Sequence, residues 1–284
     1  MVIPTRDRPR QLAACLAALA ALEAPAGGIE VIVVNDGGVL SLPAGGDLPL
    51  TVLDTGGRGP AAARNAGALR AQAPLVAFTD DDCAPEPGWA IVLLRRHWAQ
   101  PDALIGGPTV NALRDNPYSR SAQAIAESAL AHHNADPERP RLLPSSNAAA
   151  PAALFAEIGG FDETIAKAGG EDFELCNRWA ERGWSLAWAP DAAVIHSHPL
   201  DLRRFWRQQS AYGAGAFLRR RARAARGGEF ELQPSATSGI LSIAVRRAIA
   251  DRDTAMLLLI GLWQTANFAG FIGAALRSKL RGGR

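Results

Sequence analysis

Three adjacent aspartates, Asp80, Asp81 and Asp82, are the clearest chemical signal in this sequence of 284 residues. They directly follow the apolar run 75–79, which has the composition of a buried strand. Neighbouring carboxylates repel one another and need a cation or hydrogen-bond donors to hold them. A Mg²⁺ or Mn²⁺ ion bridging a protein carboxylate and a diphosphate would do so with one or two protein ligands. The alternative is an exposed acidic turn, because Asp is a common turn residue.

Two histidines are candidates to complete a metal site. His196 and His198 follow a strand predicted at 192–195, and the alternation of an extended chain directs both imidazoles to one face. Neutral imidazole is a ligand for manganese and other transition ions. The alternative is a hydrogen-bonded structural histidine, and the spacing leaves open which of the two approaches the cation.

A second acidic position follows another predicted strand. The β-branched run 30–34 leads into Asn35-Asp36-Gly37-Gly38. The Asp36 carboxylate can accept hydrogen bonds from a base or ribose, and the glycines let a nucleotide approach the backbone. No G-x-G-x-x-G motif follows this strand, which argues against a dinucleotide site. A simple strand-to-loop turn is the alternative interpretation.

A glycine-rich loop precedes the helix predicted at about 61–71. It contains Arg58, and the helix carries Arg64 and Asn65. Loop glycines, a helix N-terminus and arginines together form a cradle suited to a diphosphate. An exposed loop with ordinary helix-surface arginines would have the same sequence.

Glu171 and Asp172 stand at a predicted helix start after Gly169-Gly170. One interpretation is a general base that takes a proton from an acceptor hydroxyl. The other is acidic capping of the helix N-terminus, worth roughly 1 kcal/mol. The local sequence does not decide between them.

The elements around these residues alternate between strand and helix, which predicts an α/β fold with a mostly parallel sheet. Both acidic clusters are then expected at the carboxyl ends of strands, where such sheets bind ligands. The segment 111–145 shows no clear pattern. Hydrophobic residues make up 48% and charged residues 20%, as in ordinary globular proteins.

Charge and cysteine content exclude other classes of protein. The net charge is only +2, so no nucleic-acid partner is expected. The three cysteines, Cys15, Cys83 and Cys176, have no paired spacing, which fits a reducing compartment rather than a disulfide framework. The N-terminus shows no charged-then-apolar signal segment, so a cytoplasmic location is expected.

These clusters, in this order, resemble the family 2 inverting glycosyltransferases of the GT-A fold. The resemblance covers residues 1–217. It rests on five segments: Val2–Arg8, Val33–Gly38, Ala63–Gly67, Phe78–Pro85, and Gly159–Glu163 together with Gly170–Asp172. Single motifs of this kind are weak signals, whereas five in family order are a strong one.

The resemblance implies a role for each candidate residue. Asp80 would touch the ribose, Asp82 would hold the metal, Asp172 would be the catalytic base and Glu171 would support it. The remaining residues implied to bind the nucleotide-sugar are Pro4, Thr5, Arg8, Asp36, Arg58, Arg64, Asn65 and Asp81. His196 is preferred over His198 near the metal because it directly ends the strand.

The implied reaction is a single in-line displacement with inversion at the sugar. The metal and arginines would neutralise the departing nucleoside diphosphate while Asp172 accepts the proton of the acceptor. The Q-x-x-R-W element of processive synthases is absent, so a non-processive enzyme is expected. The alternatives are an inactive nucleotide-sugar or glycan-binding module and, less favoured, a sugar nucleotidyltransferase, which would carry a glycine-rich loop where Pro4–Arg8 stands.

The predicted domains are a GT-A catalytic domain at 1–217 and a helical region at 218–284. The catalytic domain is divided into a nucleotide-sugar half, 1–110, and an acceptor half, 111–217. The apolar stretch 255–276 is long enough to span a bilayer, and the basic segment 203–226 contains interleaved aromatics. A pair of helices packed on the catalytic domain is the alternative. We expect peripheral attachment to an anionic inner membrane surface and a glycan or lipid-linked acceptor.

Overall fold

The computed structural model describes residues 1–43, 48–165, 169–227 and 234–282. The chain forms two compact units, each assembled from separate stretches. The first contains Met1–Ala112, Asp136–Glu163 and Asp172–Ser197, and the second contains Leu113–Ala135, Thr164–Glu171 and His198–Arg284. The domain boundary that we expect after residue 217 stays a prediction.

A mostly parallel sheet is the framework of the first unit. In the described residues it has seven strands, in the order β3-β2-β1-β4-β8-β6-β9. The strands are β1 (Val2–Thr5), β2 (Val31–Asn35), β3 (Leu50–Asp54), β4 (Leu75–Thr79), β6 (Leu104–Gly106), β8 (Asn147–Pro151) and β9 (Leu186–Trp188). Only β8 runs antiparallel to its neighbours. The expected α/β class is therefore confirmed.

A second, smaller sheet in the same unit joins residues that are far apart in the sequence. Its described strands are β5 (Cys83–Pro85), β10 (Val194–His196) and β7 (Thr109–Asn111), with β10 in the middle. β10 pairs antiparallel with β5 and parallel with β7. The strand that we predicted at 192–195 thus begins two residues later and includes His196.

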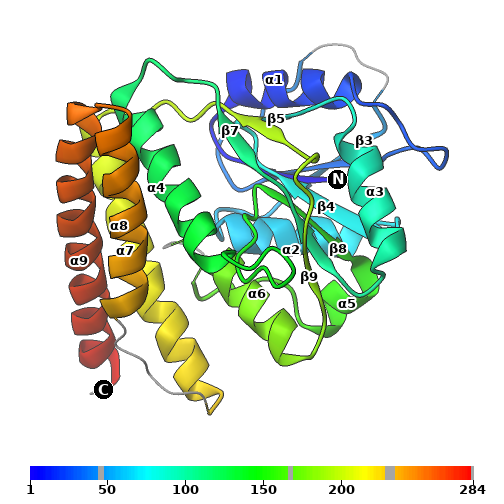
Figure 1. Ribbon diagram of the computed structural model, residues 1–284. Helices are drawn as coiled ribbons and strands as arrows, with labels where there is room; N and C mark the ends of the chain where they lie inside the picture. The colour runs from blue at the N-terminus through cyan, green and yellow to red at the C-terminus, as the bar shows by residue number, and fades with distance from the viewer. Residues whose placement is uncertain (44–47, 166–168, 228–233, 283–284) are drawn as a thin grey trace. The chain divides into compact units, whose positions relative to one another are not determined.

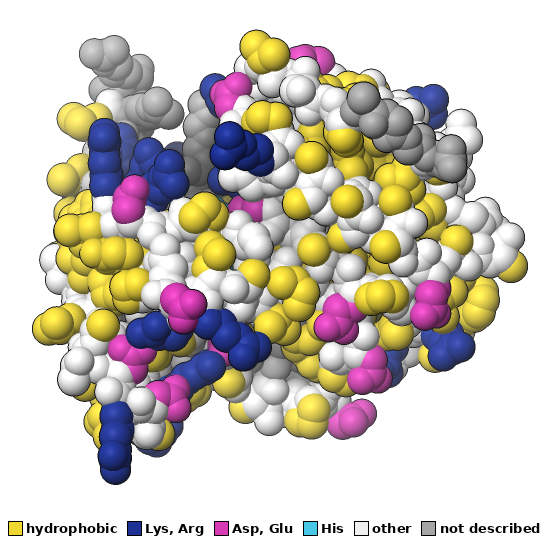
Figure 2. Space-filling model, turned by 90° about the horizontal axis from the view of Figure 1, so that it is seen from above, with side chains coloured by type: hydrophobic (Ala, Val, Ile, Leu, Met, Phe, Trp, Pro, Cys, Tyr) yellow, Lys and Arg dark blue, Asp and Glu magenta, His cyan; other side chains and the backbone are white. Residues whose placement is uncertain are grey.

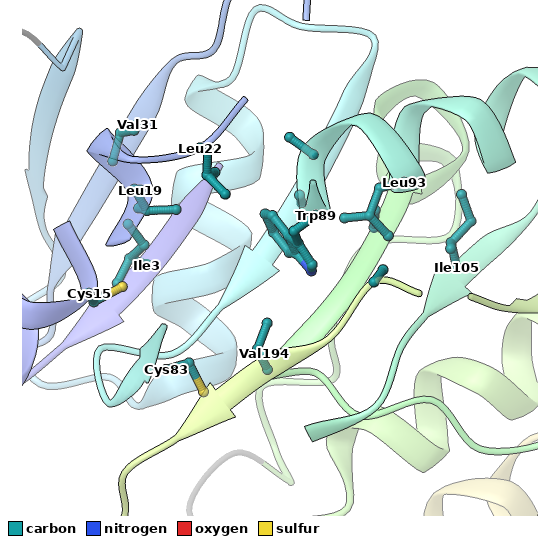
Figure 3. Close-up of a cluster of buried hydrophobic side chains, with 14 of the residues drawn as sticks. Ile3, Cys15, Leu19, Leu22, Val31, Cys83, Trp89, Leu93, Ile105 and Val194 are labelled. Carbon is teal, nitrogen blue, oxygen red and sulfur yellow. The ribbon is translucent and has the colours of Figure 1, made fainter. Parts of the chain in front are cut away.

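Helices cover both faces of the large sheet (Figure 1). Those of the first unit are α1 (Pro9–Ala20), α2 (Pro60–Arg70), α3 (Trp89–Ala99), α5 (Ala152–Glu157) and α6 (Glu171–Glu181). On one face Ile3 packs in a buried cluster with Leu19 of α1 and Leu93 of α3 (Figure 3). On the other face, the Val2 side chain packs against Gly67 of α2, where a Cβ atom would lie 2.3 Å from a Val2 methyl carbon. Successive residues of β1 therefore serve opposite layers, as the two-residue period of a strand requires.

The second unit is helical throughout its described regular structure. It contains α4 (Pro117–His133), α7 (Leu202–Ala225), α8 (Pro234–Ala250) and α9 (Thr254–Gly282). Ile125, Phe205, Ile260 and Trp263 lie in its core. The segment 111–145, which showed no sequence pattern, contains α4, because the buried face of this helix is made largely of Ala and Ser. Asn116 caps α4 through hydrogen bonds from the backbone N–H groups of its first turn.

Two glycines allow α7 and α9 to pack backbone against backbone. A Cβ atom at Gly213 would lie 1.8 Å from the carbonyl oxygen of Asn267, and one at Gly270 would lie 1.8 Å from that of Ser210. Any side chain at either position would force the helices apart. Such small-residue contacts are typical of closely crossing helices.

Candidate active site

The carboxyl ends of three neighbouring strands carry the polar residues that we predicted from the sequence. Thr5 ends β1 and lies opposite Asn35, which ends β2. The backbone N–H of Asp36 donates a 2.8 Å hydrogen bond to the Thr5 carbonyl. Asp80 follows β4, which pairs with the other side of β1. The two acidic clusters thus lie at the same edge of the sheet, where open α/β sheets bind their ligands.

Each of the three aspartates has a different set of partners. Arg64 Nη2 is 2.6 Å from Asp80 Oδ1. Asp81 accepts hydrogen bonds from Thr5 Oγ1 at 2.7 Å and from Arg8 Nη1 at 3.0 Å. The same Arg8 nitrogen is 2.9 Å from Asp82 Oδ2. The acidic run is therefore held by two arginines and is not an exposed turn, since Asp81 and Asp82 are only 3% and 6% exposed.

Burial has an electrostatic consequence for Asp81. Its removal from water raises the pKa to about 6, against the opposing effects of Arg8 and of the Thr5 hydrogen bond. The charges of Asp82 and Asp80 raise it further. Asp81 thus faces inward, toward Thr5 and Arg8, while Asp80 is the most exposed of the three carboxylates.

The small sheet brings His196 to Asp82. Cys83 lies opposite His196 in the β5–β10 ladder, and the backbone N–H of Ser197 donates to the Asp82 carbonyl at 2.8 Å. His196 Nε2 is 3.4 Å from Asp82 Oδ1. Burial acts to lower the pKa of His196, but the hydrogen bond and charge of Asp82 outweigh it, so that the pKa lies above its usual value.

One group of potential metal ligands stands out among the described residues. It comprises Asp82, Cys83 and His196, whose donor atoms all lie within 4.8 Å of one another. A carboxylate and an imidazole suit Mn²⁺. The Cys83 thiol is buried, and its pKa is raised well above normal, chiefly by loss of solvation. The donor set therefore fits a divalent cation held by Asp82 and His196. Cys83 was not among the candidates from the sequence, because it becomes relevant only through the pairing of β5 with β10.

His198 is not part of this group. It belongs to the second compact unit, where its carbonyl accepts a 2.7 Å hydrogen bond from Ser119 Oγ in α4. Of the two histidines, His196 is the one whose ring lies beside Asp82, and its role as a metal ligand stays a prediction.

Asp36 organises the glycine-rich loop. Its carboxylate accepts hydrogen bonds from the Gly59 backbone N–H at 2.9 and 3.0 Å and from Thr55 Oγ1 at 2.9 Å. A Cβ atom at Gly37, which has φ of 96°, would lie 3.4 Å from the Gly57 nitrogen. That distance is ordinary van der Waals contact, so it is the positive φ of Gly37, and not the approach of the loop before α2, that favours a glycine at the end of β2.

Asn65 and Arg58 reach the segment that follows α5. Asn65 exchanges two hydrogen bonds with the backbone of Phe161, at 2.8 and 2.9 Å. Arg58 Nη2 is 2.6 Å from Glu163 Oε2, on an exposed surface. These two predicted nucleotide ligands thus connect the predicted nucleotide side of the unit to the predicted acceptor side.

Glu171 and Asp172 form the first turn of α6. Asp172 Oδ1 accepts a 2.7 Å hydrogen bond from the Phe173 backbone N–H. Arg178 of the same helix pairs with Glu174 at 2.7 Å. It also donates hydrogen bonds to the carbonyls of Ile158 and Gly160, which attach α6 to the segment after α5. Sequence reasoning missed Arg178, although its i,i+4 spacing from Glu174 is a recognisable signal.

Two family profiles match the chain. The family described as Glycosyl transferase family 2 matches residues 1–145, and the one described as Glycosyl transferase family group 2 matches residues 79–276. A curated relative from Mycobacterium tuberculosis, named Pre-mycofactocin glycosyltransferase, is 32% identical over 227 residues. This match covers 76% of the chain and 46% of the relative, so the chain spans about half the length of the curated relatives that it matches.

Solved structures share the fold. Mannosyltransferase PcManGT from Pyrobaculum calidifontis, in complex with GDP-Man and Mn²⁺, matches with a TM-score of 0.62 and 20% identity, covering 97% of this chain and 85% of that one. GalNAc-T7 with UDP, GalNAc and Mn²⁺ matches with a TM-score of 0.54 and 15% identity, covering 70% and 43%. The expected GT-A fold is thereby confirmed.

Proposed function

We propose that this chain, which belongs to glycosyl transferase family 2, transfers a sugar from a nucleotide-sugar donor to a hydroxyl acceptor with inversion of the anomeric carbon. The observation that carries the proposal is the pairing of Asp82 with His196, beside Asp80 and Arg64, at the ligand-binding edge of a GT-A sheet. A surface turn that has no function would not be expected to pair with β10, which lies more than a hundred residues later in the sequence and brings His196 to Asp82.

Asp82 and His196 would hold a divalent cation, Mn²⁺ or Mg²⁺. Their Oδ1 and Nε2 atoms face each other at 3.4 Å, and both structural relatives described above were solved with Mn²⁺. When bound, the cation would neutralise the negative charge that develops on the departing nucleoside diphosphate.

The donor nucleotide would lie along the ends of β1, β2 and β4. Asp80, the most exposed of the three aspartates, would accept a hydrogen bond from the ribose, and its ion pair with Arg64 would orient it. Asp36 shapes the glycine-rich loop at which we place the base. Pro4, Thr5, Arg8, Arg58, Asn65 and Asp81 complete the proposed donor site, with Thr5 and Arg8 contacting the buried Asp81.

Asp172 would take the proton from the acceptor hydroxyl, with Glu171 as a supporting residue. Asp172 lies on α6, and Arg178 of the same helix pairs with Glu174 and donates hydrogen bonds to the loop 158–160. These contacts fix α6 to that loop, so the proposed base lies on a rigid element. Placing a reacting group on a rigid support lowers the entropic cost of the displacement. The reaction would be non-processive.

The acceptor is proposed from two observations. The curated relative is named for pre-mycofactocin, which makes that compound the first acceptor to test. An envelope glycan or lipid-linked acceptor is the second candidate, because α9 exposes an apolar face. Among the described residues one helical segment, Thr254–Leu280, is long and apolar enough to cross a membrane by length and composition.

We further propose that the second unit rests on an anionic membrane surface at the cytoplasmic side. Exposed apolar side chains recur along α9 at Leu258, Phe268, Ile272, Leu276 and Leu280. Figure 2 shows hydrophobic side chains gathered at its left edge, with Lys and Arg nearby. The sequences of α7 and α9 contain no Asp or Glu, so their basic residues keep a net positive charge. Apolar area flanked by cations is the composition of an interfacial helix.

Release of nucleoside diphosphate tests the catalytic proposal. UDP-, dTDP- and GDP-sugars would be screened with each acceptor in the presence of Mn²⁺ or EDTA. We expect metal-dependent release from the wild type and a loss in Asp82→Asn. Glu86→Gln removes an exposed carboxylate four residues further along and should leave turnover unchanged. Donor binding without release would favour the inactive binding module, and near-normal activity of Asp82→Asn at limiting Mn²⁺ would refute the metal assignment.

A further inference from the structure

We propose that Arg8 is the built-in counter-ion of the Asp81–Asp82 pair and that its guanidinium competes with the divalent cation for Asp82. This inference rests on the metal site proposed above. It adds a residue that controls how readily the site takes up its cation, a function that neither the fold nor the family match assigns.

The proposed competition rests on the contacts of the two Asp82 oxygens. One nitrogen, Arg8 Nη1, lies 3.0 Å from Asp81 Oδ1 and 2.9 Å from Asp82 Oδ2. The other Asp82 oxygen, Oδ1, faces His196 Nε2 at 3.4 Å. A single carboxylate therefore serves the guanidinium on one oxygen and the proposed metal position on the other. Two cations that share one carboxylate at such short range repel each other strongly, because little water separates them.

The buried carboxylates explain why an internal cation is needed. Asp81 and Asp82 are almost fully buried and adjacent in sequence. An unpaired buried carboxylate is strongly destabilising, and two neighbouring ones more so. Arg8 contacts both of them, so the fold tolerates the pair before any metal is present. The chain thus stabilises its metal-free state with a charge that the metal-loaded state no longer needs.

The Arg8 side chain can move away from the two aspartates without a change in the backbone. Its backbone is fixed at the start of α1, where its carbonyl accepts a 3.0 Å hydrogen bond from the Leu12 N–H. The preceding residue, Asp7, has φ of 53° and lies directly against Gly38. The Arg8 side chain, by contrast, is 40% exposed. Only side-chain torsions have to change for the guanidinium to move into solvent.

Arg6 provides a matched control. It lies two residues away and carries the same charge, but its side chain is 60% exposed and forms an ion pair with Asp7 at 4.0 Å. Calorimetric titration of Mn²⁺ alone into the metal-free full chain would compare wild type, Arg8→Gln and Arg6→Gln. We expect Arg8→Gln to bind Mn²⁺ at least about tenfold more tightly than wild type, the range of a typical coupling between two sites. Arg6→Gln should stay within about twofold, because an exposed charge is screened.

Thermal unfolding supplies a second readout. Without metal, Arg8→Gln should melt below wild type and Arg6→Gln should not. Saturating Mn²⁺ should raise the melting temperature of Arg8→Gln more than that of wild type, because tighter binding to the folded state stabilises it more. If Arg8→Gln does not fold without metal, Arg8→Lys is the second variant, because it keeps the positive charge but carries it on an ammonium in place of the guanidinium. Its Mn²⁺ affinity should lie between that of wild type and that of Arg8→Gln refolded with metal.

The Mn²⁺ titrations distinguish a failure of the Arg8 counter-ion from a failure of the metal site. Equal Mn²⁺ affinity in wild type and Arg8→Gln, or weaker binding in the variant, would overturn the counter-ion and leave the metal site standing. Absence of Mn²⁺ binding in all variants would overturn the metal site and the inference together. Binding by Arg8→Gln but not by wild type would support competition in its strongest form.

Discussion

The indole Nε1 of Trp89 donates a 2.8 Å hydrogen bond to the side-chain oxygen of Asn147, and both residues are completely buried. The amide nitrogen of Asn147 donates to the carbonyls of Pro108 and Ala192, at 2.9 and 2.7 Å. Asn147 also lies opposite Thr79, the residue before Asp80, in the β4–β8 ladder. The Asn147 side chain therefore links α3 and β8 to the residues that precede β7 and β10. It does so beside the end of β4, from which the aspartates follow.

We accordingly expect Asn147→Ala to destabilise the protein severely. The substitution leaves the indole N–H of Trp89 without its acceptor and removes one donor from each of two carbonyls, of which that of Pro108 keeps the Val194 N–H. It should lower the free energy of unfolding by roughly 3–5 kcal/mol. Denaturant unfolding followed by tryptophan fluorescence measures it. Asn177→Ala, at a half-buried position on α6, is the control and should cost about 1 kcal/mol or less. A comparable loss in both variants would contradict the role of the Asn147 network.

Asp172→Asn should affect the chemical step alone. A general base contributes about 10²–10⁴-fold to the rate, so kcat should fall within that range while the KM for the donor changes little. Glu181→Gln removes a carboxylate from the exposed far end of the same helix and should leave kcat unchanged. A parallel rise in donor KM for Asp172→Asn would instead indicate a structural role at the start of α6.

Metal affinity should depend on pH through His196. Its pKa in the folded protein is raised, so protonated His196 stabilises the metal-free state below about pH 6.5, and this contribution is lost as the pH rises through the folded-state pKa. A cation needs the neutral imidazole, so Mn²⁺ affinity should rise with pH, by up to about tenfold per unit below that pKa. Titrations between pH 5.5 and 8.5 measure the slope.

The variant His196→Gln should bind Mn²⁺ weakly and lose most of the slope. His97→Gln, in α3, should retain it, because the pKa of His97 is lowered by burial and the residue lies outside the ligand group. A flat profile for wild type would mean that His196 does not approach the cation.

Membrane attachment should depend on the outer face of α9. Phe268 is 69% exposed, and Phe268→Asp would place a charge within the apolar face, which should abolish sedimentation with anionic vesicles at low salt. Leu69→Asp alters an apolar residue on α2 that is even more exposed, at 87%, and should sediment like wild type. If the wild-type protein does not sediment with anionic vesicles, the membrane proposal is refuted. If the wild type forms a dimer and Phe268→Asp does not, the apolar face of α9 binds a second copy of the chain instead.

The sequence revealed the parts of the site that depend on local order. β4 was predicted at its observed bounds, and the aspartates follow it as expected, because a buried strand and the turn after it are both visible in neighbouring residues. The GT-A fold followed from the order of several such segments. α2 also lies within one residue of its predicted bounds, since Pro60 suits a helix start.

What the sequence could not reveal depends on register between distant strands. Nothing near Cys83 indicates that it lies opposite His196, and nothing near Asn147 indicates that Trp89 donates to it. α4 was missed for a different reason: Ser121, Ala124 and Ser128 are small enough to be buried in a helix core yet give little hydrophobic contrast. The Asn116-Pro117 pair was the available signal for its start.

The antiparallel pairing of β5 with β10 joins residues that are synthesised at different times. Asp82 and His196 are 114 positions apart (196 − 82), so at roughly 5–20 residues per second the histidine leaves the ribosome on the order of ten seconds after the aspartate. Arg8, Thr5 and Asp81 have all been translated before that delay begins. A nascent chain therefore already contains the arginine that pairs with its aspartates before His196 has been translated. The proposed metal site can be completed only after the later part of the unit has been synthesised.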